Sequence, residues 1–181
     1  MEILETELKE VKLIKPKIFE DGRGFFYECY NEQVFRELLG IREHFFQDNH
    51  SRSCKNVLRG LHYQMVHPQG KLVRAAKGEI FDVAVDMRKS SPNFGKWVGM
   101  YLSEKNHLMA WIPPGFAHGF LALSEEADVL YKATSPYHKD SDRSLLWSDS
   151  SVGIDWPLTD TPLLSDKDAA GIAMRLADCY T

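Results

Sequence analysis

Short runs in which apolar and polar residues alternate dominate the middle of the chain. Across residues 78–87, the large apolar side chains Phe81, Val83, Val85 and Met87 alternate with smaller or charged ones. This period of two is typical of a β-strand with one face on a hydrophobic core. Similar runs predict further strands at residues 57–64, 71–76, 96–102, 107–112, 119–123 and 128–134.

Turn signals rather than helices separate these predicted strands. They are Pro68-Gln69-Gly70, Ser91-Pro92-Asn93 and Pro113-Pro114-Gly115. Many short strands at regular spacing favour an antiparallel sandwich or barrel. We therefore expect a mainly β fold that is closed or nearly closed. No internal repeat or linker divides the sequence, so residues 1–181 are predicted to form a single domain.

Two short helices are expected outside the sheets. One spans residues 32–39, where Asn31 suits the N-cap and Gly40 suits the stop. Leu38 lies on the apolar face of this predicted helix. The other helix begins near Ser165 and carries the C-terminal segment.

Composition and charge exclude several function classes. The net charge of −4 gives no overall attraction to nucleic acid or to an anionic membrane, so a polyanionic substrate needs a local basic cluster. No apolar run approaches the roughly 20 residues of a membrane-spanning helix. The first ten residues lack the pattern of a secretion signal. Three cysteines without a Cys-x-x-Cys pair indicate reduced thiols, and hence a cytoplasmic protein.

A polar cluster at residues 47–51 and 58–64 contains a candidate for acid–base chemistry. His62 lies in an apolar strand, where a histidine near neutral pH can accept and release a proton. The alternative is a structural histidine that is hydrogen-bonded inside the barrel. Under strict alternation, Arg59 would lie on the opposite face from His62. A bulge at Gly60 would bring both side chains to one side.

Lys71 and Tyr131 each allow a chemical and a structural interpretation. Lys71 follows a turn, where it either stabilises an oxyanion or is a solvated lysine at a strand end. Tyr131 shares a predicted apolar face with Val129 and Ala133, so we expect it to point inward. An inward tyrosine is either a packing residue or a suitable acid across a pocket from a histidine.

Asp168 has two competing interpretations. Ser165-Asp166-Lys167-Asp168 fits a helix capping box, in which Ser165 is the cap and Asp168 reaches back to it. In the alternative, the carboxylate of Asp168 holds His62 in one tautomer and stabilises its imidazolium. The spacing alone favours the cap.

A metal site is not expected. Residues 113–118 match the second cupin motif, P-x-G-x-x-H. The first cupin motif needs a closely spaced His-x-His followed by Glu, and this chain offers only His62 and His67. Residues five apart in a strand lie on opposite faces, so these two histidines would not converge on one ion.

Residues 21–26 are predicted to form a tight turn because glycines stand at alternate positions. The segment lacks the pattern of a phosphate-binding loop. Arg23 and Phe26 beside the turn could still bind a phosphate and stack on a base.

Six motifs occur in order along the chain. They are QDNHS at 47–51, LRGLH at 58–62, QGKLVR at 69–74, GEIFDVAVD at 78–86, WIPPGFAHGF at 111–120 and LYKAT at 130–134. In this combination, over nearly its whole length, the chain resembles the dTDP-4-dehydrorhamnose 3,5-epimerases. The resemblance implies an antiparallel double-stranded β-helix, a cupin-like jelly roll with a few short helices. It also implies a cofactor-independent isomerase that works as a homodimer with exchanged strands.

The resemblance also implies roles for individual residues. His62 matches the proton acceptor of the family, with Asp168 as its support, and Tyr131 matches the proton donor. Lys71 would stabilise the enolate oxygen. Substrate-binding positions are matched by Arg23, Phe26, Glu28, Gln47, Asn49, Arg59, His118 and Lys167. Of these, Arg59 would contact the diphosphate, and the first three would serve a nucleotide site shared with a neighbouring subunit.

The implied reaction inverts carbons 3 and 5 of a dTDP-4-keto-6-deoxy sugar through an enolate. Two departures from the family bear on substrate contacts. Asp142, in the loop expected after the tyrosine strand, stands where many members carry Glu, and the residues after Ala133-Thr134, where some members place a stacking tyrosine, read Ser135-Pro136-Tyr137. Three alternatives remain open. They are a relative that inverts one carbon, a metal-dependent cupin enzyme and a non-catalytic sugar-binding module.

Overall fold

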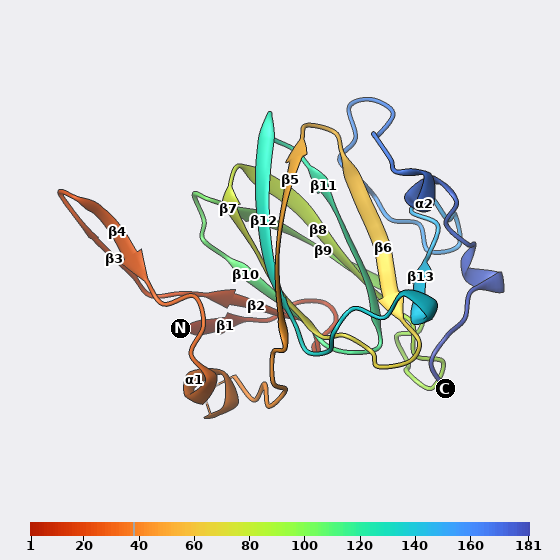
Figure 1. The fold of residues 1–181 in the computed structure, drawn as a ribbon, viewed down its shortest axis with the longest axis horizontal. Coiled ribbons are helices and arrows are strands. Elements are labelled where there is room, and N and C mark those ends of the chain that lie inside the picture. The colour runs from red at the N-terminus through yellow and green to blue at the C-terminus, as the bar shows by residue number, and fades with distance from the viewer. Residues whose placement is uncertain (38) are drawn as a thin grey trace.

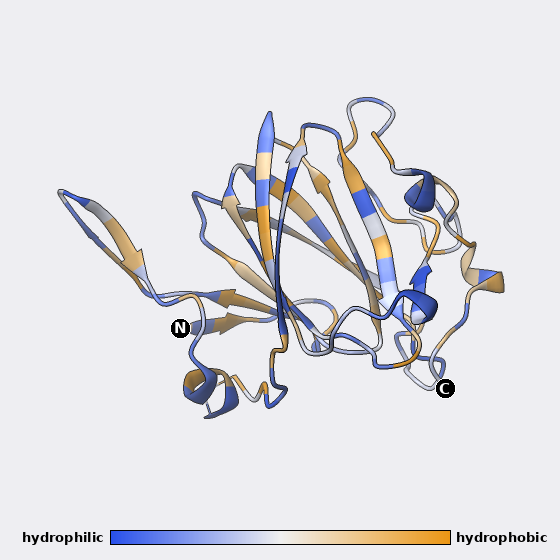
Figure 2. Cartoon of the chain, viewed as in Figure 1, coloured by the Kyte–Doolittle hydropathy of each residue, from blue (hydrophilic) through white to orange (hydrophobic). Residues whose placement is uncertain are grey.

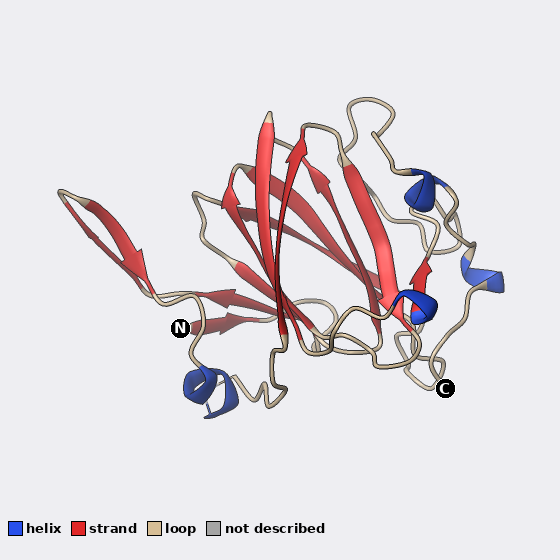
Figure 3. Ribbon diagram, viewed as in Figure 1, coloured by secondary structure: helices blue, strands red, loops and turns tan. Residues whose placement is uncertain are grey.

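Two antiparallel sheets pack face to face in the computed structural model, which describes residues 1–37 and 39–181 (Figures 1 and 3). The six-stranded sheet runs β1 (Glu2–Leu4), β2 (Lys12–Lys15), β10 (Met109–Ile112), β7 (Lys71–Lys77), β12 (Glu126–Ala133) and β5 (Gln47–Cys54). The five-stranded sheet runs β13 (Asp142–Ser144), β6 (Leu58–Gln64), β11 (Phe116–Ala122), β8 (Glu79–Asp86) and β9 (Trp97–Ser103). The predicted mainly β jelly roll is confirmed.

The seven predicted strands are confirmed as β6 to β12, with small shifts at their ends. Strand β5 was not predicted, because it lacks the alternation of apolar and polar residues. Figure 2 shows it as mostly hydrophilic along its length. Its inward face carries Gln47, Asn49 and Ser51, and Ser51 lines a polar cavity rather than the hydrophobic core. A strand beside such a cavity need not show an apolar face.

The two expected helices exist, but both are short. Helix α1 (Glu32–Glu37) begins after Asn31, whose side-chain oxygen accepts the Val34 N–H at 3.2 Å; the predicted position of Leu38 lies outside the described residues. Helix α2 (Asp166–Ala169) is capped by Ser165 as predicted. The expectation that α2 carries the C-terminal segment is wrong. The helix ends at Ala169, and the chain then passes so close to Leu146 that a Cβ at Gly171 would lie 2.8 Å from the Leu146 backbone. Ile172 forms a parallel β-bridge with Leu145.

Apolar residues fill the space between the sheets and also cover the outer face of the five-stranded sheet. Val73 and Val129 from one sheet meet Phe120 from the other in the inner core. The outer face packs under the C-terminal segment, including Trp156. Strand β8 is therefore buried on both faces, whereas its pattern predicted one. Its charged residues Asp82 and Asp86 are buried, and they pair with His118 and Arg88.

Strands β3 (Ile18–Asp21) and β4 (Gly24–Tyr27) form a hairpin that projects from the body of the protein (Figure 1). The predicted turn is confirmed between them, and the side chain of Asp21 accepts the Arg23 N–H at 2.9 Å. Phe19 and Phe26 are direct partners across the hairpin and are 54% and 70% exposed. An isolated two-stranded hairpin is marginally stable, and exposed aromatic pairs mark contact surfaces.

Candidate active site

A cavity of about 220 Å³ lies between the sheets. Strands β5, β6, β7, β11 and β12 and helix α2 contribute to its lining. The lining residues are Ser51, Arg59, His62, Lys71, His118, Gly119, Phe120, Tyr131, Ser165 and Asp168. The fold thus brings together all four residues predicted to carry the chemistry, and it places Arg59 and His118 beside them.

A bulge in β6 orients Arg59 and His62 toward this cavity. His62 pairs with His118 of β11, whereas Arg59 pairs with Phe120, so β6 holds one more residue than its partner over this stretch. Gly60 has a φ of +113°, and a Cβ there would lie 2.6 Å from the Gly119 Cα. The predicted bulge at Gly60 is confirmed, and glycine is required by the close approach of the two strands.

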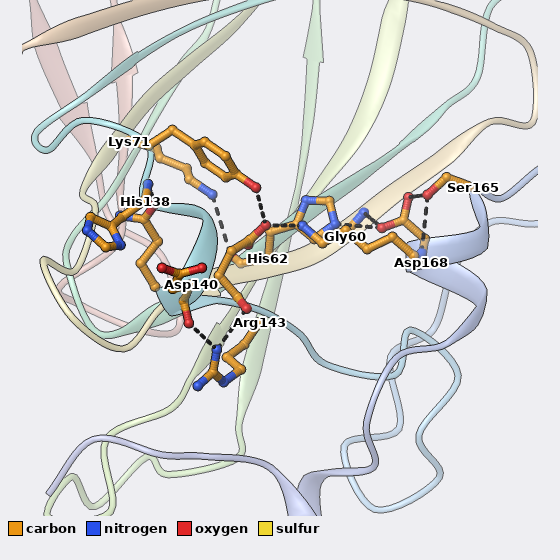
Figure 4. A network of polar contacts seen from close by, with 12 residues as sticks. Gly60, His62, Lys71, His138, Asp140, Arg143, Ser165 and Asp168 are labelled. Carbon is orange, nitrogen blue, oxygen red and sulfur yellow. Dashed lines mark hydrogen bonds and ion pairs between the residues drawn. The ribbon is translucent and has the colours of Figure 1, made fainter.

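His62 and Asp168 form a hydrogen-bonded pair (Figure 4). His62 Nε2 lies 2.5 Å from Asp168 Oδ1, and the Gly60 N–H donates to the same oxygen at 3.4 Å. Ser165 Oγ donates to Asp168 Oδ2 at 2.8 Å and accepts the Asp168 N–H at 3.2 Å. The two interpretations of Asp168 are therefore compatible, because one residue both completes the helix start and holds the histidine.

The charge of Asp168 determines which nitrogen of His62 is free. Burial raises the pKa of Asp168, but hydrogen bonds from His62 and Ser165 outweigh this effect and hold it below its usual range. The group is therefore a carboxylate at neutral pH, and it accepts a hydrogen bond from the Nε2–H of His62. A neutral His62 then presents an unprotonated Nδ1, which can act as a base.

Lys71 is buried beside His62, so the interpretation as a solvated strand-end lysine is wrong. It is 8% exposed, and its Nζ donates to the carbonyl oxygen of His62 at 3.4 Å. Burial lowers the pKa of Lys71 to about 8, against the opposing charges of Asp142 and Asp82. At neutral pH the ammonium is still mostly charged, and it is weakly solvated. Such a cation suits a developing oxyanion.

His118 forms a second pair with a carboxylate. Its Nε2 lies 2.7 Å from Oδ1 of Asp82, and both side chains are buried. Burial lowers the pKa of His118, which keeps it neutral at pH 7. Sequence reasoning missed Asp82, because it looked like one of the small or charged residues on the solvent face of a strand. The available signal was a carboxylate on β8, the strand that pairs with the His118-bearing strand β11.

Tyr131 packs on the inner core and faces the cavity, as predicted. In register it lies between Asn49 of β5 and Val73 of β7. Burial raises the pKa of Tyr131 above its usual value. The hydroxyl is therefore protonated across the neutral range, as a proton donor must be.

The inward face of β5 offers unused hydrogen-bonding groups beside the cavity. Gln47 donates to Asn49 Oδ1 at 2.8 Å. Within the described part of the chain, Asn49 Nδ2 and Ser51 Oγ are buried without a hydrogen-bond partner. Buried polar atoms are seldom left unpaired in folded proteins, so such atoms indicate a polar ligand.

Asp142 and Lys167 pair with each other outside the cavity lining. Asp142 Oδ2 accepts from Lys167 Nζ and also from the Tyr137 hydroxyl at 3.0 Å. The pair joins the start of β13 to helix α2, so Asp142 lies in a strand rather than in the expected loop. The shorter carboxylate of Asp142 thus still reaches a lysine next to Asp168.

Arg23, Phe26 and Glu28 lie apart from the cavity within the same chain. Arg23 pairs with Asp21 at the tip of the β3–β4 hairpin, at 2.6 Å, and Glu28 Oε2 accepts from Asn31 at 3.1 Å. Arg23 and Phe26 border a different hollow on the hairpin. The described residues 1–37 and 39–181 contain no group of three or more His, Cys, Asp or Glu side chains placed to hold a metal ion. Across the same residues, no helix is long and apolar enough to cross a membrane.

The jelly roll brings a carboxylate-backed histidine, a buried lysine and a protonated tyrosine to one cavity, an arrangement that suits an isomerase acting by proton transfer. The sequence model of the dTDP-4-dehydrorhamnose 3,5-epimerase family matches residues 5–175, and the chain belongs to that family. It is 57% identical over 171 residues to the Salmonella typhimurium enzyme of that name, covering 94% of this chain and 93% of the relative. It is 56% identical over 181 residues to the Shigella flexneri enzyme, covering 99% of each chain.

The solved structures agree with the sequence comparison. A dTDP-6-deoxy-D-glucose-3,5-epimerase from Legionella pneumophila, crystallised with dTDP-4-keto-L-rhamnose, superimposes with a TM-score of 0.96 at 53% identity. The match covers 98% of this chain and 94% of the Legionella chain. The agreement extends over both sheets and the C-terminal segment that carries Asp168.

Proposed function

We propose that the protein epimerises a dTDP-linked 4-keto-6-deoxy sugar at carbons 3 and 5, and so converts dTDP-4-dehydro-6-deoxyglucose to dTDP-4-dehydrorhamnose. The observation that carries this proposal is a carboxylate-backed His62 in one cavity with the buried cation Lys71 and the protonated Tyr131. The ligand of the Legionella relative supports the same substrate class.

The 4-keto group supplies the acidity that the reaction needs, so we propose that no cofactor takes part. His62 Nδ1 removes a proton from a carbon next to the ketone, and Asp168 stabilises the imidazolium that forms. The electron pair moves onto the keto oxygen, giving an enolate. The ammonium of Lys71 stabilises this negative charge.

Tyr131 then returns a proton to the opposite face of the carbon, which inverts the centre. Its hydroxyl is available because burial keeps it protonated. After each inversion, the proton held by His62 passes to solvent and Tyr131 is reprotonated from solvent, so both groups are reset before the second carbon reacts. The cycle at the second carbon repeats these steps. Neutral His118 would hydrogen-bond the sugar beside Lys71, and the unpaired groups of Asn49 and Ser51 would bind its hydroxyls next to Gln47.

Product stereochemistry tests this function against its alternatives. Incubating dTDP-4-keto-6-deoxyglucose with the purified protein should give the sugar inverted at both carbons, identified by its proton coupling constants. A product inverted at one carbon would establish the single-carbon epimerase. Binding without turnover would favour a sugar-binding module, and activity lost to chelators and restored by a metal would favour the metal-dependent enzyme.

The activity should fall at alkaline pH through the titration of Lys71. Its pKa of about 8 means that the ammonium loses its proton as pH rises through that value, and enolate stabilisation is lost with it. We expect kcat to decline above pH 8 with an apparent pKa near 8. In Lys71→Arg the residual activity should lack this decline, because a guanidinium stays charged. An identical decline in both proteins would contradict the assignment.

The protein is also proposed to form a homodimer in which the β3–β4 hairpin reaches the neighbouring subunit. Arg23, Phe26 and Glu28 lie away from the cavity of their own chain, yet the family resemblance assigns them to the nucleotide site. A hollow of about 540 Å³ on the outer face of the six-stranded sheet, near the base of the hairpin, offers a surface for the partner. The second copy would cover the exposed aromatic pair Phe19 and Phe26.

Removing this aromatic pair should weaken the dimer. Burial of one Phe side chain contributes about 1.5–3 kcal/mol, so Phe19→Ser with Phe26→Ser in both subunits should raise the dimer dissociation constant at least about 100-fold. Sedimentation equilibrium measures this constant. Phe94→Ser is the matched control, since Phe94 is 38% exposed on a different surface, and it should leave the dimer unchanged. A dimer of wild-type strength in the double variant would refute the hairpin contact.

Two further properties follow as proposals. A biosynthetic enzyme acting on a nucleotide sugar fits a cytoplasmic location, since such substrates are made there. The 181 residues are proposed to act as one domain, because the C-terminal segment completes the cavity that the sheets begin.

A further inference from the structure

Ser165 makes two hydrogen bonds whose directions are both determined. Its Oγ accepts the Asp168 N–H at 3.2 Å as the N-cap of α2. Its own proton is then directed to Asp168 Oδ2 at 2.8 Å. Oδ1 of the same carboxylate accepts from His62 Nε2 at 2.5 Å. A directional chain therefore runs from the helix start to the imidazole ring (Figure 4).

We propose that Ser165 is a positioning residue, which fixes the Asp168 carboxylate and through it the Nε2–H tautomer of His62. The part of this inference that concerns turnover rests on the proposed function. The effect of Ser165 on the His62 imidazole does not depend on the substrate. This role belongs to the hydrogen bond that the Ser165 hydroxyl donates to Asp168 Oδ2, and not only to the cap bond that it accepts.

The surroundings of Asp168 explain why a positioning group is needed. Helix α2 has four residues, too few to be stable by its own hydrogen bonds. The Asp168 side chain is 5% exposed, so bulk water has little access to replace a lost donor. Without the hydroxyl, Oδ2 would lack its partner in a buried position. The carboxylate would then rotate or withdraw to find another donor, and His62 would lose its fixed orientation.

A set of substitutions at residue 165 separates positioning from capping. Ser165→Ala removes the cap and the donor. Ser165→Gly removes the donor but costs a helix N-cap only a few tenths of a kcal/mol. Ser165→Thr retains both hydrogen bonds. If the hydroxyl positions Asp168, Gly should behave like Ala, and Thr like the wild type.

A matched control exists in the same C-terminal segment. Ser151 Oγ donates to Asp149 Oδ1 at 2.5 Å, and Asp149 also accepts the Met174 N–H at 2.7 Å. Ser151→Ala therefore removes the same kind of bond away from the cavity. It should leave kcat, KM and the state of His62 unchanged.

The kinetic test measures kcat and KM on the 4-keto sugar. Ser165→Ala and Ser165→Gly should lower kcat about tenfold, equal to about 1.4 kcal/mol in the barrier, with KM within about twofold. Ser165→Thr should stay within about threefold of the wild type. In an Asp168→Asn background, Ser165→Ala should have little further effect, because Ser165 acts through that carboxylate. Full additivity of the two substitutions would overturn the proposal.

The spectroscopic test needs no turnover, so it distinguishes a failure of this inference from a failure of the proposed function. In protein labelled with ¹⁵N-histidine, the wild type and Ser165→Thr should show a single tautomer of His62, with the proton on Nε2. Ser165→Ala and Ser165→Gly should shift both ring nitrogens toward the averaged values of a mixed population. His62 shifts identical to those of the wild type in these two variants would overturn the proposal.

Discussion

Replacing His62 with alanine is expected to lower kcat by about 10³-fold or more. General bases contribute typically 10²–10⁴-fold, and this residue also receives the proton in both half-cycles. The Nδ1 atom is the free basic nitrogen because Nε2 is held by Asp168. Steady-state rates on the 4-keto sugar measure the effect.

The same substitution leaves Asp168 with one buried partner fewer, so its effect on folding needs a separate readout. Circular dichroism should show intact sheets with a lower Tm, since Ser165 and the Gly60 N–H still hold the carboxylate. His67→Ala is the control, because His67 is an exposed histidine beyond the end of β6. A His62→Ala protein that retained most of its activity would show that another group is the base.

Lys71→Met is expected to change activity and stability in opposite directions. Loss of an oxyanion-stabilising group typically costs about 10²–10³-fold in kcat. The buried ammonium is also costly to the fold, because burial lowers the pKa of Lys71 from 10.5 to about 8. At pH 7 both the folded and unfolded states carry the proton, so the folded state bears the full desolvation cost. A methionine of similar length removes that cost, and we expect the variant to be more stable by about 1–3 kcal/mol.

The pH dependence of this difference checks its origin. Between about pH 8 and 10.5 the unfolded state binds more protons than the folded state, so the wild type gains stability as pH rises. The advantage of Lys71→Met should therefore shrink over this range in denaturant titrations. Lys77→Met is the control on the same strand, because Lys77 is exposed and pairs with Glu126 at 2.6 Å. If Lys71→Met were less stable than the wild type, this would contradict the claim that burial of the Lys71 ammonium destabilises the folded state.

Local sequence patterns predicted the strands that pack on apolar residues, but not β5, which borders the site, nor the short strands before it. Strands β6 to β12 show a period of two because at least one face packs on apolar residues. Strand β5 has polar residues on both faces, since one side is exposed and the other faces the cavity. The strands before it are short, and β3 and β4 expose aromatic residues that indicate a partner rather than a core.

The site residues were predicted in part by pattern and in part by family resemblance. The glycine at position 60 indicated the bulge, and the apolar neighbours of Tyr131 indicated its inward direction. No spacing rule connects His62 with Asp168, because the two are joined only when the C-terminal segment folds back over β6. The partners Asp82 and Ser165 were missed as site residues for the same reason. Buried polar groups that are far apart in the sequence, such as Asp82 and His118, are brought together only by the fold.

Deuterium exchange tests the central claim most directly. The wild-type protein and His62→Ala would each be incubated in heavy water with dTDP-4-keto-6-deoxyglucose, and proton NMR would follow the signals at carbons 3 and 5. We predict that the wild type incorporates deuterium at both carbons and that His62→Ala incorporates it at neither. Exchange at both carbons in the variant, or at neither carbon in the wild type, would contradict proton abstraction by His62.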